Sequence, residues 1–207
     1  MSAHSVFQPA RRTLFNTPGL TPLLRWFSKR CMSAVGWTIA GHLPEASPKA
    51  VLIAAPHTSN WDLPYSLMTC FILGIQPYWL GKASLFKFPF RGTMRWLGGI
   101  EVDRSRSQNL VSSAIEGFVN HKGPLLLMIP PEGTRSKVRE WKTGFYFIAQ
   151  GAGVPIVMAF MDYGKKHAGL GPELEMTGDV QMDMARAKAF YAPIRGRRAD
   201  QFDASHE

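Results

Sequence analysis

The 207-residue sequence predicts an α/β fold: a single layered domain in which helices flank a mostly parallel central sheet. Short apolar runs at residues 51–55, 125–129 and 154–160 are typical of buried strands. Segments with helical periodicity separate these runs, as they do in sheets whose parallel strands are joined by crossover helices. The length suits one well-buried core, and a composition of 45% hydrophobic and 19% charged residues is that of a globular chain.

The elements can be assigned in chain order. A basic amphipathic helix over 21–35 and a strand over 37–41 are expected before the buried strand 51–55. The next helix should cover 60–73, with Ser59 or Asn60 as its N-cap and Pro64 in its first turn, where proline is tolerated. The remaining expected elements are strands at 78–80, 100–102, 125–129, 154–160 and 174–177, helices at 107–121, 144–151 and 182–190, and a broken helical stretch at 85–97.

Composition divides the chain into three segments. Residues 1–48 are predicted to form an N-terminal basic amphipathic helical appendage that associates with membranes, and residues 49–195 to form the main domain. Residues 196–207 are polar and are expected to form a mobile tail.

The net charge of +9 predicts an anionic partner. Up to Lys49 there are six basic residues against one acidic residue, and they are interleaved with Trp, Phe and Leu. This pattern favours a helix that lies on an anionic membrane surface, although an amphipathic helix packed on its own domain would look similar. Binding to nucleic acid is not expected, because no motif of that class is present.

The longest uncharged run, 63–81, contains Pro64, Gln76 and Pro77, and it reads as a helix, a turn and a strand rather than as a membrane span. Because no secretory signal is evident, we expect a cytoplasmic protein bound peripherally to the inner face of the cell membrane. Cys31 and Cys70 have no metal-ligand spacing and are interpreted as small core residues in a reducing compartment. No cofactor and no metal are expected.

The first candidate site residues are His57 and Asp62, five positions apart after the strand at 51–55. On one continuous helix their side chains would diverge by about 140°. They can meet if His57 lies in the strand-to-helix turn and Asp62 in the first helical turn. Asp62 would then fix the imidazole tautomer and leave the other ring nitrogen to act as a base. Alternatively, His57 is an ordinary turn histidine and Asp62 a carboxylate favoured by the helix dipole.

A second candidate segment, Glu132 to Arg135, follows the strand at 125–129. Ligands gather at the carboxyl ends of the strands in such sheets, so this loop and His57 should share one edge. Gly133 permits close backbone approach, Thr134 adds a hydroxyl, and the Arg135 guanidinium matches phosphate oxygens. The alternative is that Glu132 and Arg135 form an ion pair with each other and bind no ligand.

Two further basic residues are candidate phosphate ligands. Arg104 follows the strand at 100–102, and Lys82 follows the strand at 78–80. For Lys82, a solvated surface position is a comparable alternative.

The order of these blocks resembles the glycerophospholipid acyltransferases, the group that includes lysophosphatidate acyltransferases. The family pattern is His-x4-Asp, then Gly with Asp-Arg, then Glu-Gly-Thr-Arg, then Val-Pro-Ile-Val. The corresponding residues here are His57 with Asp62, Gly99 with Asp103 and Arg104, 132–135, and 154–157. Matching segments run over about half the chain, which makes residues 49–195 the expected acyltransferase domain of a phospholipid-biosynthesis enzyme.

The resemblance implies direct transfer of a fatty acyl group from acyl-CoA or acyl carrier protein to a hydroxyl of a lysophospholipid, by default 1-acylglycerol 3-phosphate. His57 would be the general base, oriented by Asp62. Arg104, Glu132, Gly133 and Arg135 would hold the glycerol-phosphate part of the acceptor. Pro56, Glu101 and Met158 depart from the family's usual residues without touching the proposed base. The alternative function is a non-catalytic module that binds anionic lipid at a membrane surface.

Overall fold

The computed structural model describes residues 7, 9–43, 48–102 and 107–202. Within these residues a seven-stranded sheet has the strand order β1-β7-β6-β2-β5-β3-β4. Its strands are β1 (Thr38–Ala40), β2 (Lys49–Ala55), β3 (Pro77–Lys82), β4 (Gly99–Val102), β5 (Leu125–Ile129), β6 (Ile156–Asp162) and β7 (His167–Leu174). The helices are α1 (Leu20–Ala34), α2 (Asp62–Leu73), α3 (Arg91–Trp96), α4 (Ser107–Asn120), α5 (Gly144–Ala152) and α6 (Val180–Tyr191), with 3-10 turns η1 (Leu14–Asn16), η2 (Ala83–Phe86) and η3 (Ala199–Gln201).

The predicted mostly parallel α/β fold is confirmed. Strands β2 to β6 run parallel to one another, with β2 hydrogen-bonded to β5 on one side and to β6 on the other. Among the described strands, only β7 pairs antiparallel, against β6, and β1 then pairs parallel to β7. The carboxyl ends of β2, β3, β5 and β6 therefore meet at one edge of the sheet.

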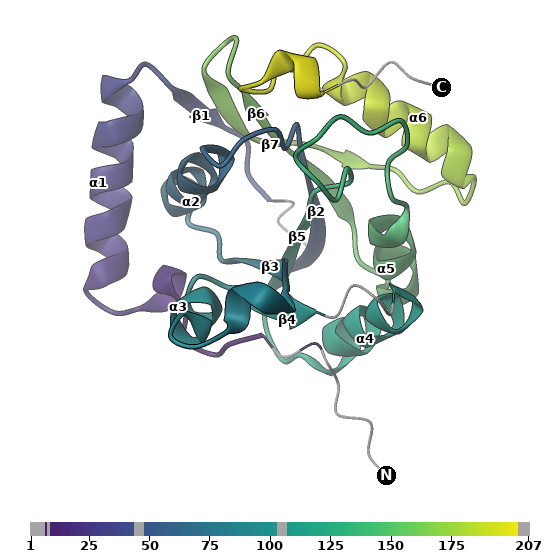
Figure 1. Cartoon of the computed structure of the whole chain (residues 1–207), viewed down its shortest axis with the longest axis horizontal. Coiled ribbons are helices and arrows are strands. Elements are labelled where there is room, and N and C mark those ends of the chain that lie inside the picture. Colours follow the sequence, from purple (N-terminus) through teal and green to yellow (C-terminus); the bar gives the residue numbers. More distant parts are fainter. Residues whose placement is uncertain (1–6, 8, 44–47, 103–106, 203–207) are drawn as a thin grey trace.

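Helices cover both faces of the sheet, with α4, α5 and α6 on one face and α2 on the other (Figure 1). The buried side chains of β2 alternate between these two layers, as the period of a strand requires. Val51 and Ile53 join the core cluster under α4 to α6, whereas Ala50 and Leu52 join the cluster under α2. The alternation explains why this strand is apolar without interruption.

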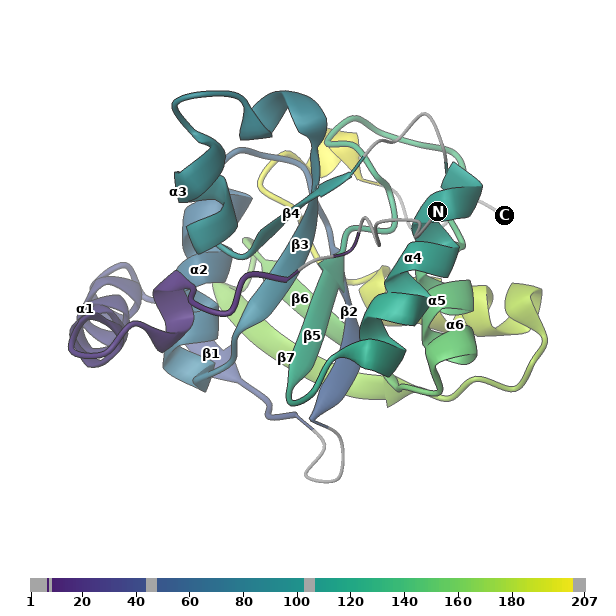
Figure 2. The same ribbon diagram turned by 90° about the horizontal axis from the view of Figure 1, so that it is seen from below.

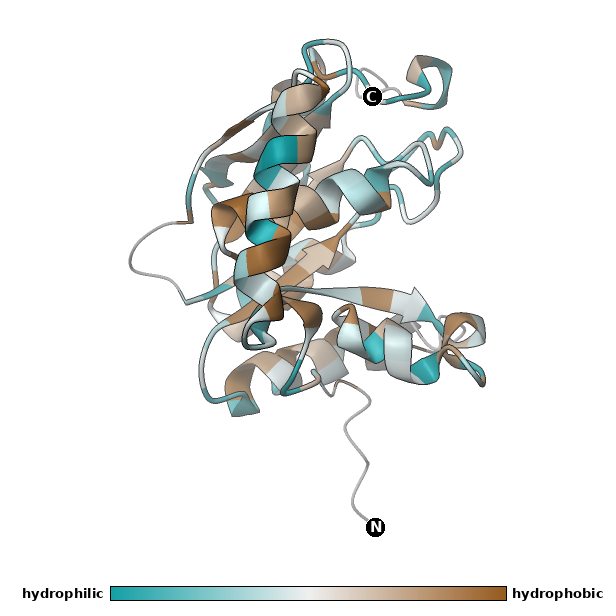
Figure 3. Cartoon of the chain, turned by 90° about the vertical axis from the view of Figure 1, so that its left-hand side faces the viewer, coloured by the Kyte–Doolittle hydropathy of each residue, from teal (hydrophilic) through white to brown (hydrophobic). Residues whose placement is uncertain are grey.

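The helix α1 packs outside α2, where Arg25 donates a hydrogen bond from Nη2 to the Ile72 carbonyl oxygen at 3.2 Å. Ser28 and Met32, one helical turn apart, are buried, whereas the large side chains Leu23, Trp26 and Phe27 are exposed. Figure 3 views the molecule from the side of α1 and shows hydrophobic and hydrophilic positions along it. Among the described residues, no helix is both long and apolar enough to cross a membrane.

The N-terminal segment also contributes β1 to the edge of the sheet, so residues 38–40 are integrated with the main domain rather than appended to it. The division at residue 48 and the membrane association of residues 1–48 stay predictions. At the other end, the described part of the segment 196–207 packs against the domain. There Arg198 donates a hydrogen bond from its backbone nitrogen to Thr58 Oγ1 at 3.2 Å, and Phe202 lies against the core.

Two local predictions were wrong. The cap of α2 is Trp61 and not the predicted Ser59 or Asn60, although Ser59 Oγ does accept a hydrogen bond from the Trp61 backbone nitrogen at 3.2 Å. The last strand is β7, which covers His167–Leu174 and not the predicted 174–177. Its two glycines and its proline hide the apolar alternation, since these residues are rare in strand interiors.

Cys70, on α2, lies in the core, and burial raises the pKa of its thiol to about 12. Because the thiolate is the reactive form, we expect iodoacetamide at pH 8 to alkylate Cys70 in the folded protein at least about a hundredfold more slowly than in denaturant. Mass spectrometry of the alkylated peptides measures both rates, with the half-buried Cys31 as the internal comparison. Equal rates for Cys70 in the two conditions would contradict the packing described for α2.

Candidate active site

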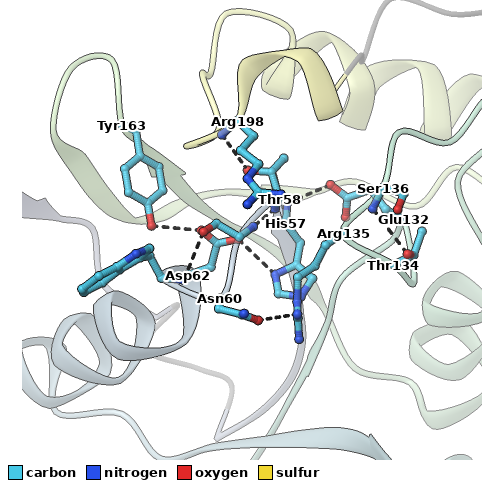
Figure 4. A network of polar contacts seen from close by, with 12 residues as sticks. His57, Thr58, Asn60, Asp62, Glu132, Thr134, Arg135, Ser136, Tyr163 and Arg198 are labelled. Atoms are coloured by element: carbon cyan, nitrogen blue, oxygen red, sulfur yellow. Dashed lines mark hydrogen bonds and ion pairs between the residues drawn. The ribbon is translucent and has the colours of Figure 1, made fainter.

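The candidate site lies at the carboxyl edge of the sheet, where β2 and β5 end side by side. His57 follows β2 after one intervening residue, and the loop that contains 132–135 follows β5. Figure 4 shows that side chains from these two segments point toward one another. The parallel pairing of neighbouring strands thus joins two motifs that are separated by about seventy residues in the sequence.

The His57 and Asp62 side chains meet in the way that the strand-to-helix turn predicts. Asp62 is the first residue of α2 and His57 precedes the helix, so the two side chains do not diverge around one helical axis. His57 Nδ1 lies 3.3 Å from Asp62 Oδ2. The imidazole is 30% exposed, whereas the carboxylate is nearly buried. The pair therefore has one sheltered partner and one that solutes can reach.

Asp62 is held by more than His57. Its Oδ2 accepts hydrogen bonds from the backbone nitrogens of Thr58 and Ser59 at 2.8 and 2.9 Å, and its Oδ1 accepts one from the Tyr163 hydroxyl at 2.9 Å. Burial acts to raise the pKa of Asp62, but the hydrogen bonds from His57, Ser59 and Tyr163 outweigh it and leave the pKa below its ordinary value. The carboxylate is therefore ionised at neutral pH.

Glu132 is hydrogen-bonded to the loop that contains His57. Its Oε1 accepts a hydrogen bond from the His57 backbone nitrogen at 3.0 Å, and the residue is 5% exposed. Burial raises the pKa of Glu132. Its other oxygen, Oε2, is buried and has no hydrogen-bond partner among the described residues. Glu132 and Arg135 therefore have different partners, His57 and Asn60, and the alternative in which they pair with each other does not apply. A contact between Glu132 and an acceptor stays a prediction.

Arg135 reaches across from the loop after β5 to the His57 motif. Its Nη1 donates a hydrogen bond to Asn60 Oδ1, and the guanidinium is exposed (Figure 4). Thr134, also exposed, accepts at its Oγ1 a hydrogen bond from the Ser136 backbone nitrogen at 3.4 Å. Gly133 has φ 66°, and a Cβ there would lie 3.0 Å from the Lys142 side chain. A larger residue at 133 would therefore be strained.

Lys82, another predicted phosphate ligand, is not brought to this cluster. Lys82 is exposed at the end of β3, and β5 separates that strand from β2. Arg104 lies outside the described residues. Both assignments stay predictions. Within the described ranges, no three His, Cys, Asp or Glu side chains group so as to hold a metal ion.

Sequence reasoning missed the residues that close the site from the side of β6. Tyr163 follows β6 directly, and burial together with the negative charge of Asp62 raises the pKa of its hydroxyl, which stays a donor. The Arg197 guanidinium carbon lies 5.5 Å from the centre of the Trp61 ring and 5.8 Å from that of the Tyr163 ring. The only available signal for Tyr163 was its place after a buried strand, a hundred residues beyond Asp62.

A cavity begins at His57 and Asp62 and continues between α2 and the sheet. Its walls are mostly apolar. From α2 and the turn after it they include Cys70, Leu73 and Ile75, and from the sheet they include Met128, Ala159 and Leu170. The cavity is small, with a volume of about 50 Å³, and it combines a titratable pair with apolar walls.

Comparisons with a family model and with curated proteins both match this chain to acyltransferases. The family model "Acyltransferase" matches residues 38–161. Proteins named 1-acyl-sn-glycerol-3-phosphate acyltransferase are similar: that of Salmonella typhimurium is 36% identical over 109 residues, and that of Escherichia coli is 34% identical over 119 residues. The matches cover 50% and 55% of this chain but 43% and 46% of those proteins, so the chain matches less than half the length of either relative.

A solved structure shares the fold. The crystal structure of the 1-acyl-sn-glycerophosphate acyltransferase PlsC from Thermotoga maritima superposes with a TM-score of 0.55, covering 83% of this chain and 76% of that one. The sequence identity is 18%, so this likeness concerns the fold alone.

The carboxylate of Asp62 predicts a pH-dependent stability. Asp62→Asn removes an ionised acceptor from two amides and a hydroxyl and should lower the free energy of unfolding by about 2–4 kcal/mol at pH 7. Since the pKa of Asp62 is lowered from 3.8 in the folded state, its contribution is present above that value and is lost as pH falls through the folded pKa.

The gap between wild type and variant should therefore shrink below about pH 4. Urea unfolding at a series of pH values measures it. Asp200→Asn, at an exposed position, is the control and should change stability little. A gap that is equally large at pH 7 and pH 3 would contradict an ionised Asp62.

Proposed function

Because the chain belongs to the Acyltransferase family, we propose that it moves a fatty acyl group from acyl-CoA or acyl carrier protein to a hydroxyl of a lysophospholipid or related glycerolipid. The default acceptor is 1-acylglycerol 3-phosphate, the compound in the names of the similar curated proteins. The observation that carries the proposal is the His57–Asp62 pair at the start of an apolar cavity, with the Arg135 guanidinium bonded to the same loop.

His57 is the proposed general base. Asp62 faces Nδ1, so that nitrogen holds the proton and Nε2 is free to accept one. Nε2 removes the proton of the acceptor hydroxyl while its oxygen attacks the carbonyl carbon of the thioester. The tetrahedral intermediate then expels the thiolate as the carbon–sulfur bond breaks, and the imidazolium returns the proton to that sulfur. No acyl-enzyme is formed in this scheme.

Asp62 supports this chemistry through charge. An ionised, buried carboxylate stabilises the imidazolium that forms when His57 takes the proton. The three donors from Thr58, Ser59 and Tyr163 keep that carboxylate in place, so little reorganisation is needed during the reaction.

Arg135 is the proposed ligand of the acceptor phosphate. Its exposed guanidinium presents a planar pair of donors, and it is bonded to Asn60, which lies three residues after His57. Gly133 and Thr134 shape the same loop, Glu132 fixes the loop to the His57 backbone, and Lys82 and Arg104 are proposed as further basic contacts. The first carbons of the hydrocarbon chain would enter the cavity beside α2, whose apolar walls favour them.

The proposed location is cytoplasmic, with the protein bound peripherally to the inner face of the cell membrane. The basic N-terminal segment and the exposed Trp26 and Phe27 of α1 support this placement, since a helix of this kind binds anionic lipid surfaces.

The role of His57 can be tested by removing the imidazole. His57→Ala should reduce thiol release from acyl-CoA, in the presence of 1-acylglycerol 3-phosphate, by roughly a hundredfold to ten-thousandfold. Binding of acceptor-containing vesicles should be unchanged, because the phosphate ligand remains. His42→Ala is the matched control, since His42 is exposed on the chain that leads to the amino end of β2. Undiminished turnover by His57→Ala would exclude this base.

The role of Arg135 can be tested by comparing the KM for the acceptor with the KM for acyl-CoA. Arg135→Ala should raise the KM for the acceptor by roughly 10- to 100-fold, as expected for a lost bond to a charged group, and change the KM for acyl-CoA little. Arg135→Lys should restore only part of the loss, because lysine lacks the planar fork. Arg139→Ala in the same loop is the control. An unaltered acceptor KM would place the phosphate elsewhere.

A further inference from the structure

The segment between β3 and α3 carries the most exposed large hydrophobic side chain among the described residues. Phe88 is 96% exposed, Phe90 is 61% exposed and Leu85 is 47% exposed. An aromatic ring held almost entirely in water is costly, and neighbouring exposed apolar side chains often mark a contact with another molecule. This group of residues has no part in the site described above.

The segment has a fixed base and a projecting tip. Phe86 is buried at 4% and packs where Gly81 and Gly99 leave room, since a Cβ at either glycine would lie within 3.0 Å of its ring. A turn follows in which Phe90 donates a hydrogen bond from its backbone nitrogen to the Lys87 carbonyl oxygen at 2.9 Å. Phe88 lies inside that turn. The exposed ring is therefore presented by an anchored turn.

The charge around this tip is of one sign. Residues 82–98 contain four basic residues and no acidic one. All four, Lys82, Lys87, Arg91 and Arg95, are exposed, and the one acidic partner described for them is Glu101, whose Oε2 lies 3.8 Å from Arg91 Nη2. Aromatic rings flanked by lysine and arginine match the two layers of a lipid surface, with the rings in the acyl boundary and the cations at anionic headgroups.

The tip also lies at the functional end of the sheet. It follows β3, whose direction is that of β2 and β5, so it emerges from the same edge as His57 and Arg135. Figure 2 shows α3 and the turn before it at the end of the sheet where the loop after β5 also lies. A lipid surface bound there would lie beside the opening of the proposed site.

We propose that the turn 85–90 is a membrane-docking loop, which inserts Phe88 and Phe90 into an anionic phospholipid bilayer while Lys87, Arg91 and Arg95 bind its headgroups. This inference rests on the proposed function insofar as it concerns access to a lipid substrate. It adds a second contact to the one proposed for α1 and orients the carboxyl edge of the sheet toward the bilayer.

Vesicle sedimentation of the full chain tests the loop directly. With vesicles of phosphatidylcholine and phosphatidylglycerol in equal parts, Phe88→Ser/Phe90→Ser should weaken partitioning roughly tenfold or more. Lys87→Gln/Arg95→Gln should weaken it by a similar factor on these vesicles but not on phosphatidylcholine alone. The control is Phe147→Ser, at a 44% exposed ring on α5 across the molecule from α3 (Figure 1). All variants should unfold at the wild-type temperature, because the changed side chains are exposed.

A paired activity assay separates the inference from the proposed function. The Phe88→Ser/Phe90→Ser variant should lose acyl transfer to an acceptor embedded in vesicles but keep it toward a short-chain, water-soluble acceptor. Absence of turnover by the wild type on both acceptors would refute the proposed function while leaving the sedimentation test intact. Unchanged vesicle binding by the loop variant would overturn the inference. Loss of binding only in a Trp26→Ser/Phe27→Ser variant of α1 would overturn it as well.

Discussion

The Asp62 carboxylate accepts hydrogen bonds from two backbone amides of the preceding turn and from the Tyr163 hydroxyl, and it faces the His57 imidazole. The contacts with His57 and with the two amides depend on the short distance between the end of β2 and the start of α2. The carboxylate is buried and ionised, so the elements around it are held to positions in which its charge is compensated. The rest of the site takes its geometry from this turn.

The sheet topology then adds the second half of the site. β5 and β6 flank β2, so the loops that follow them lie on either side of His57. From β5 come Glu132, which accepts from the His57 backbone, and Arg135, which bonds to Asn60. From β6 comes Tyr163. A layered α/β sheet therefore places an imidazole, a carboxylate and a guanidinium at one edge, which is where such sheets usually bind ligands.

Much of this could be predicted from the sequence, because the signals were local. The continuous apolar run of β2 and the order of His57 and Asp62 predicted a strand, a turn and a helix in this order, although the helix begins two residues later than expected. The four ordered blocks predicted the family, which the family match confirms. The antiparallel β7 was missed because Gly169, Gly171 and Pro172 obscure its alternation. Tyr163 and the packing of Arg198 on Thr58 were missed because no local pattern encodes a contact across a hundred residues.

Some surface features could likewise be predicted from the sequence, and others could not. The basic N-terminal helix was predicted from composition, but its packing on α2 and the contribution of β1 to the sheet depend on tertiary contacts. The segment 85–90 was expected to be part of a broken helical stretch. The structure instead buries Phe86 and leaves Phe88 outside, a division that follows from the space beside Gly81 and Gly99.

The account depends on one bound molecule touching both halves of the site. A crystal structure of the protein with 1-acylglycerol 3-phosphate measures this most directly. We expect the phosphate on the Arg135 guanidinium and the free hydroxyl within about 3 Å of His57 Nε2. A phosphate bound away from Arg135, or a hydroxyl out of reach of the imidazole, would contradict the account.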